Sequence, residues 1–98
     1  FNATEYDGGT IASGTFTPDP ANGNFQKIIN GGAHTLAVPA TTCTIVIQCT
    51  NNASAGSIMT NGFTKVKGDV ISTTNGDDFI FYITRDNGFT SLTVEALQ

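Results

Sequence analysis

TCTIVIQCT, residues 42–50, is the longest run of strand-forming residues in the chain. In an extended conformation, alternate side chains point to opposite faces of a strand. One face of this segment is then wholly apolar and comprises Cys43, Ile45, Ile47 and Cys49. The other face is mostly polar, a pattern typical of a sheet that rests one side on the core. The sequence therefore predicts a central strand here, with which neighbouring strands pair.

Asparagine–glycine pairs divide the rest of the chain into pieces of strand length. Both residues tolerate a positive φ, which suits the type I′ turns of hairpins. The five pairs begin at Asn22, Asn30, Asn61, Asn75 and Asn87. No segment shows useful helical periodicity, and no repeat of fixed period is evident. We therefore predict one all-β domain over residues 1–98, an antiparallel, jelly-roll-like β-sandwich of about seven to nine short strands.

The turns and the alternation of apolar residues assign a range to each expected strand. Residues 1–9 are expected to form a polar lead-in, continuous with any upstream segment. The strands before the central one are predicted at 10–17, 24–30 and 33–38. Those after it are predicted at 57–60, 63–67, 70–74, 77–84 and 90–97. The Asn61-Gly62 turn separates 57–60 from 63–67, and Asn87-Gly88 joins 79–84 to 90–97 as a hairpin.

The strand at 77–84 carries apolar side chains on both of its faces. Phe79 and Phe81 lie on one face, whereas Ile80 and Tyr82 lie on the other. Because one face meets the core, Ile80 and Tyr82 are predicted to contact a loop or another subunit. The seven phenylalanines of the chain are assigned to the core.

The two cysteines cannot bridge each other if the central strand is continuous. Six residues of extended chain separate Cys43 from Cys49 by about 20 Å, whereas the Cα atoms of a disulfide lie within about 7 Å. Two alternatives remain open for these thiols. They are buried on the core face as small apolar groups, or they form a bridge to a neighbouring chain.

Charge and hydropathy exclude two classes of partner. The net charge is −4, and the basic residues are only Lys27, Lys65, Lys67 and Arg85. Nucleic-acid binding needs a field from many more cations. No apolar run approaches the roughly 18 residues of a membrane-spanning helix. We therefore expect neither a nucleic-acid nor a membrane partner.

The sequence shows no catalytic, cofactor or metal site. His34, the single histidine, has no evident nucleophile to activate, and the glycine pairs precede strands rather than a phosphate-binding helix. Glu5 and Asp7 could offer oxygen ligands to Ca²⁺, but nothing marks the remaining ligands. Tyr6 and Tyr82 are the candidates for an exposed aromatic platform, so a carbohydrate-binding module is the alternative to a structural role.

Motifs spread over nearly the whole chain resemble those of small β-sandwich domains in virion structural proteins of tailed bacteriophages and prophages. They are NATEYDG (2–8), DPANGNFQ (19–26), GGAHTLAVP (31–39), TIVIQ (44–48), NASAG (52–56), GFTKVKGD (62–69), DFIFYI (78–83) and LTVEAL (92–97). Both cysteines lie outside the recurrent pattern.

The resemblance implies a non-enzymatic protein of the virion, an extracellular particle. It would serve in a tail fibre, a head fibre or a capsid decoration. Its partners would be other virion proteins, the capsid or tail subunits. It would form a homo-oligomer, with a trimer favoured, and could contact a host-surface glycan. The interface residues predicted with it are Ile80, Tyr82 and Tyr6, and the thiols that could link subunits are Cys43 and Cys49.

Overall fold

The computed structural model describes residues 5–97 and consists almost entirely of strands. In chain order the elements are β1 (Tyr6–Ile11), β2 (Thr15–Phe16), the short 3₁₀ helix η1 (Pro20–Asn22), β3 (Phe25–Asn30), β4 (His34–Ala37), β5 (Cys43–Asn51), β6 (Ile58–Asn61), β7 (Lys65–Gly68), β8 (Asp78–Asp86) and β9 (Phe89–Leu97). The all-β class is confirmed, and the nine strands lie at the upper end of the predicted range.

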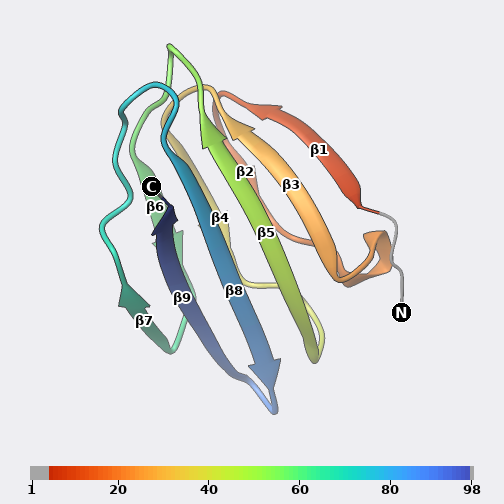
Figure 1. Cartoon of the computed structure of the whole chain (residues 1–98). Helices are drawn as coiled ribbons and strands as arrows, with labels where there is room; N and C mark the ends of the chain where they lie inside the picture. Colours follow the sequence, from red (N-terminus) through yellow and green to blue (C-terminus); the bar gives the residue numbers. More distant parts are fainter. Residues whose placement is uncertain (1–4, 98) are drawn as a thin grey trace.

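The strands form two sheets that enclose one core (Figure 1). The larger sheet has the order β1-β3-β5-β8-β9-β7, and the smaller has the order β2-β4-β6. In Figure 1 the larger sheet faces the viewer and the smaller one lies behind it. This arrangement is the expected sandwich-like one, with the inner face of each sheet turned to the core.

The smaller sheet is wholly parallel and the larger sheet is mixed, which corrects the predicted antiparallel arrangement. The pairs β1–β3, β3–β5, β2–β4, β4–β6 and β7–β9 are parallel. Only β5–β8 and β8–β9 are antiparallel. The reason is that the chain changes sheet after each of its first six strands. It therefore returns to each sheet running in the same direction as before, whereas the chain of a jelly roll reverses its direction. We call this winding of β1 to β6 around the core the coil.

Each winding of the coil contains about as many residues as the one before. Tyr6 of β1 aligns with Gln26 of β3, 20 residues later, and Phe25 aligns with Val46 of β5, 21 residues later. The structure thus contains a repeat that is not evident in the sequence. Successive windings of the coil stack when their strands place apolar side chains on the same face of the sheet. The same residues therefore need not recur in each winding.

Only one of the asparagine–glycine pairs forms a hairpin among the described residues. Asn87 and Gly88 have φ values of 50° and 81°, as a type I′ turn requires, and they join β8 to β9. This was the predicted pairing of 79–84 with 90–97, and it is confirmed. The Asn61-Gly62 pair instead ends β6, and the next strand, β7, belongs to the other sheet.

Two stretches differ from their predicted ranges. The described part of the lead-in, from Tyr6 onward, belongs to strand β1, and the strand expected at 10–17 is interrupted at residues 12–14. Residues 1–4 lie outside the described range. Residues 70–74 form no strand. Their Ile71 instead packs against the core cluster.

The core confirms the faces predicted for the two strongest strands. Ile45 and Ile47 of β5 are fully buried. Phe79 and Phe81 of β8 are buried as well, and their ring centroids are 6.4 Å apart. Leu92 of β9 lies beside them in the same cluster. Because these side chains occupy the inner face, their neighbours in sequence are directed to the outer face of the larger sheet.

Candidate functional site

One row of aligned residues on the outer face of the larger sheet is apolar across three adjacent strands. Phe25 of β3 aligns with Val46 of β5, which aligns with Tyr82 of β8. Phe25 is 42% exposed and Tyr82 is 41% exposed, whereas Val46 is half-buried between them. Ile80 lies on the same face, two residues from Tyr82. We call Phe25, Val46, Ile80 and Tyr82 the outer-face patch.

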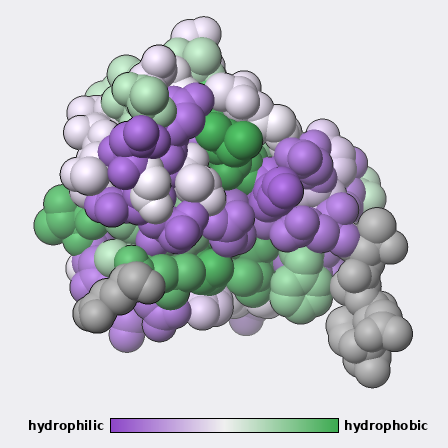
Figure 2. Space-filling model, turned by 45° about the horizontal axis from the view of Figure 1, so that its top comes forward, coloured by the Kyte–Doolittle hydropathy of each residue, from purple (hydrophilic) through white to green (hydrophobic). Residues whose placement is uncertain are grey.

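Hydrophobic groups gather on the surface of the molecule in the view of Figure 2. They form a band across the lower part of the visible surface, with hydrophilic residues above it. Exposed apolar area bordered by polar groups is typical of a surface that meets a partner.

Polar side chains next to the outer-face patch are fixed by hydrogen bonds to one another. Gln48 aligns with Ile80, and its Nε2 donates to Thr50 Oγ1 at 2.8 Å and to Asp78 Oδ1 at 3.2 Å. The Thr50 hydroxyl also donates to Asp78 Oδ1, at 2.5 Å. These bonds hold the border of the patch in one arrangement before any partner arrives.

A shallow hollow opens beside the patch. It has a volume of about 330 Å³ and is lined by Asn24, Phe25, Thr44 and Val46. The Asn24 amide closes one side by donating to the Thr44 carbonyl oxygen at 2.6 Å. The hollow therefore continues the apolar surface of Phe25 and Val46 and offers a place for a small projecting group.

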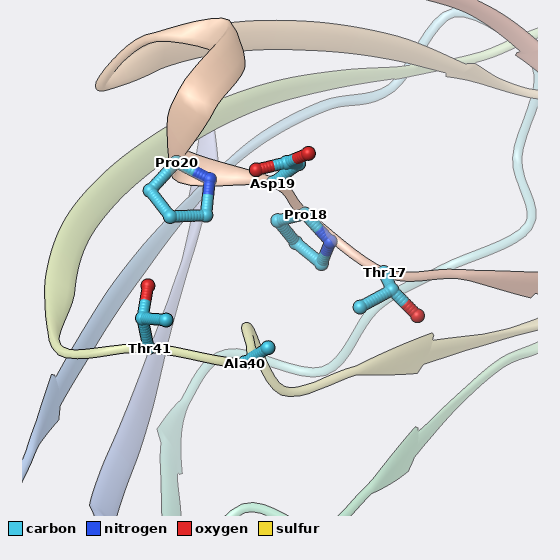
Figure 3. Close-up of a pocket in the computed structure, with 6 residues that line it drawn as sticks. All are labelled: Thr17, Pro18, Asp19, Pro20, Ala40 and Thr41. Atoms are coloured by element: carbon cyan, nitrogen blue, oxygen red, sulfur yellow. The ribbon is translucent and has the colours of Figure 1, made fainter.

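A second pocket lies between the segment that leads into η1 and the loop before β5 (Figure 3). Its volume is about 360 Å³, and its lining consists of Thr17, Pro18, Asp19, Pro20, Ala40 and Thr41. The Asp19 carboxylate points away from Ala40 and Thr41 and accepts the Ala21 N–H at 2.9 Å, as an N-cap does. Asp19 is the one titratable residue in this lining, and its Oδ1 is engaged by the Ala21 N–H.

The structure does not bring the two tyrosines together. Tyr6 aligns with the buried Gln26 and so lies on the inner side of the sheet, at its edge, where it is 38% exposed. Tyr82 lies on the outer face. The aromatic residue on the same row as Tyr82 is Phe25, which is exposed and not in the core, contrary to the prediction for the phenylalanines. In an extended strand Phe25 points to the face opposite Gln26 and Ile28. This alternation predicts an exposed Phe25 only if Gln26 is known to be buried.

The two cysteines differ in their access to solvent. Cys49 is fully buried, and burial raises the pKa of its thiol to about 12. Cys43 is half-buried, which raises the pKa of its thiol, while the nearby Arg85 opposes that rise. Both thiols are free. A bridge to another chain could therefore reach Cys43, whereas Cys49 would have to leave the core first.

Titratable side chains do not assemble into a reactive group in the part of the chain that the structure describes. His34 is buried, with Nδ1 2.8 Å from the Gly32 carbonyl oxygen. Asp77 accepts the Ser72 hydroxyl, whereas Asp78 accepts the Thr50 hydroxyl, so the two carboxylates diverge. Residues 5–97 contain no group of three or more potential metal ligands.

Over the same residues, no helix has the length and apolar character needed to cross a membrane. No protein-family model matches the chain, and neither the curated proteins nor the solved structures include a match to it. The outer-face patch is thus the feature with the strongest functional indication.

Proposed function

We propose that this chain is a non-enzymatic structural domain of a bacteriophage virion that associates with other virion subunits through the outer-face patch. The observation that carries the proposal is the aligned row of Phe25, Val46 and Tyr82 on the solvent side of the larger sheet. The inner side of that sheet already forms the core, so the row contributes little to folding and is available to a partner.

The physical basis is the chemistry of protein interfaces. Aromatic side chains are enriched where partners bind most strongly, particularly when a polar border excludes water around them. Phe25 and Tyr82 supply the aromatic groups, and Gln48 and Asp78 belong to the ordered border. All four project from paired strands, so little conformational entropy is lost when a partner covers them.

The virion assignment rests on the sequence motifs that resemble bacteriophage structural domains. It places the chain in a tail fibre, a head fibre or a capsid decoration of the extracellular particle. A surface rich in neutral polar residues, with only 12% of residues charged, is compatible with that location. The resemblance favours a homotrimer, and we propose that its subunits meet through the outer-face patch.

Light scattering after size exclusion tests the proposal, in the presence and absence of reductant. We expect a stable oligomer that Ile80→Asp dissociates, because a buried carboxylate at the interface would lose its hydration. Thr73→Asp adds the same charge to an exposed loop and serves as the control. An oligomer and a melting temperature unchanged by Ile80→Asp would contradict the proposal, and dissociation by reductant would implicate Cys43.

Carbohydrate binding is a second candidate, favoured by the presence of two exposed aromatic rings on one face. Sugars stack their apolar sides on such rings and hydrogen-bond to neighbouring polar groups, here Gln48 and Asp78. A glycan array should then give hits that Phe25→Ala and Tyr82→Ala abolish. Tyr6→Ala should preserve them, because Tyr6 lies on the other side of the sheet. An array without hits would reject this candidate.

A further inference from the structure

Both sheets end in strands that have one edge without a partner among residues 5–97. At one end are β1 and β2, which are joined by residues 12–14. At the other are β6 and β7, which are joined by residues 62–64. Figure 1 shows β1 and β7 at opposite margins of the larger sheet. An open edge presents unpaired backbone groups that can bind another strand.

The two outer strands of the larger sheet run in the same direction. β1, β3 and β5 are mutually parallel, β8 is reversed, and β9 is reversed again. Because β7 is parallel to β9, it shares the direction of β1. A second copy could therefore add its β1 to the free edge of β7 and continue the parallel pairing found within the coil.

These two edges carry opposite charges on the same face of the sheet. Lys65 and Lys67 of β7 are two of the four basic residues in the chain. Lys67 aligns with Thr93, which aligns with Tyr82 on the outer face. At the other edge, Asp7 aligns with Lys27, also on the outer face. Glu5 lies two residues before Asp7, immediately ahead of β1.

One register matches the two edges in charge. It places Lys65 opposite Glu5 and Lys67 opposite Asp7. Cross-strand neighbours of opposite charge attract each other.

The same register also matches the inner side of the edges. It brings Val66 opposite Tyr6. Val66 is 50% exposed and aligns with the buried Leu92, and Tyr6 aligns with the buried Gln26, so both are inner-side residues. A slip of one residue would bring each lysine opposite an inner-side residue and lose both matches.

We propose that the chain binds a second copy of itself head to tail, by parallel pairing of β7 with β1 of the next copy. Such a contact joins two different surfaces and leaves a free edge at each end, so further copies can add to either end; the product is a linear filament unless the rotation between copies closes a ring. The contact is separate from the outer-face patch and does not depend on the virion assignment.

Sedimentation velocity at low salt, from micromolar to millimolar protein, is the first test. The average mass should rise continuously with concentration, and high salt should reduce it by screening the charge pairs. Lys65→Glu/Lys67→Glu should weaken association by about tenfold or more, as should Glu5→Lys/Asp7→Lys. Lys67→Glu alone should weaken association more than Lys27→Glu. The second substitution makes the same change in charge on β3, which is paired on both edges within one copy.

Mixing the two double variants is the decisive step. The first has two acidic edges and the second has two basic edges, so each variant alone should repel itself and the mixture should associate again. The proposal is overturned if the wild-type chain stays monomeric throughout, or if the mixture fails to associate. Circular dichroism must show that both variants are folded.

A carbodiimide cross-link between Lys67 of one copy and Asp7 of another, identified by mass spectrometry, tests the register without any substitution. Its absence from an associated wild-type sample would also overturn the proposal. Ile80→Asp should leave head-to-tail growth intact, so a failure of the outer-face interaction can be told apart from a failure of this one.

Discussion

The coil formed by β1 to β6 and the hairpin formed by β8 and β9 follow different rules. In the hairpin, paired strands are adjacent in sequence, and the turn at Asn87-Gly88 sets their register. In the coil, paired strands are about 20 residues apart and another strand intervenes. Short-range chemistry therefore determines the hairpin, whereas the coil depends on long-range contacts. Four experiments test this difference between the two regions.

Phe81→Ala should have the largest effect, because Phe81 lies where the two regions meet. It aligns with Ile47 of the coil on one side and with Val94 of the hairpin on the other. The cavity should lower the free energy of unfolding by about 4 kcal/mol, as measured by urea denaturation. Tyr82→Ala, on the exposed side of the same strand, is the control and should cost much less. Equal losses would mean that the two regions do not share a core.

Asn51→Ala should be the next most severe and tests the coil. The Asn51 side chain accepts from Asn30 Nδ2 at 3.0 Å and donates to the carbonyl oxygens of Ser72 and Thr74. Its removal leaves buried polar groups unpaired, at a cost of about 3 kcal/mol. The neighbouring Asn52→Ala should cost less than about 1 kcal/mol, because Asn52 bonds within its own turn. A small loss for Asn51→Ala would contradict its role in stacking the turns.

Gly88→Ala and Gly14→Ala should each cost about 1 kcal/mol, since both glycines have positive φ and open space around them. The two variants should differ in their rates of folding and unfolding. Gly88 belongs to the local hairpin and Gly14 to the coil, and local contacts tend to form first. We expect Gly88→Ala mainly to slow folding and Gly14→Ala mainly to speed unfolding in stopped-flow experiments. The reverse pattern would indicate that the coil forms first.

The smallest effect concerns pH. Burial raises the pKa of Cys49 in the fold to about 12. The unfolded chain therefore loses this proton at lower pH than the folded chain, so stability falls as pH rises from about 9 towards 12. At about pH 9.5 the loss should be below ~1 kcal/mol. Cys49→Ala should remove this part of the pH dependence, and an unchanged slope would contradict the assignment.

The sequence predicted the parts of the fold in which local and global preferences agree. The apolar face of β5 and the β8–β9 hairpin follow from alternation and turn chemistry. Of the outer-face patch, Ile80 and Tyr82 were identified because their strand is apolar on both sides. Phe25 is not predicted to be exposed, because in an alternating strand the apolar residue is expected on the core face and the glutamine in solvent. Here Gln26 is buried and Phe25 is exposed.

The coil itself could not be predicted from these residues. Asn30-Gly31 and Asn61-Gly62 have the same composition as the hairpin turn Asn87-Gly88, yet they end strands whose successors lie in the other sheet. Whether such a pair forms a hairpin within one sheet depends on where the apolar residues that follow it can be buried. That is a tertiary contact, with no local signature.

The place of the hairpin in the larger sheet also bears on synthesis at the ribosome. β8 and β9 leave the ribosome after β7, yet they lie between β7 and β5 in the sheet. Until they emerge, β7 has no neighbour in that sheet and the long apolar strand β5 has a free edge. The nascent chain thus passes through a stage in which one edge of this apolar strand is unprotected. Slow elongation over residues 69–97 would prolong that stage and favour binding of a chaperone.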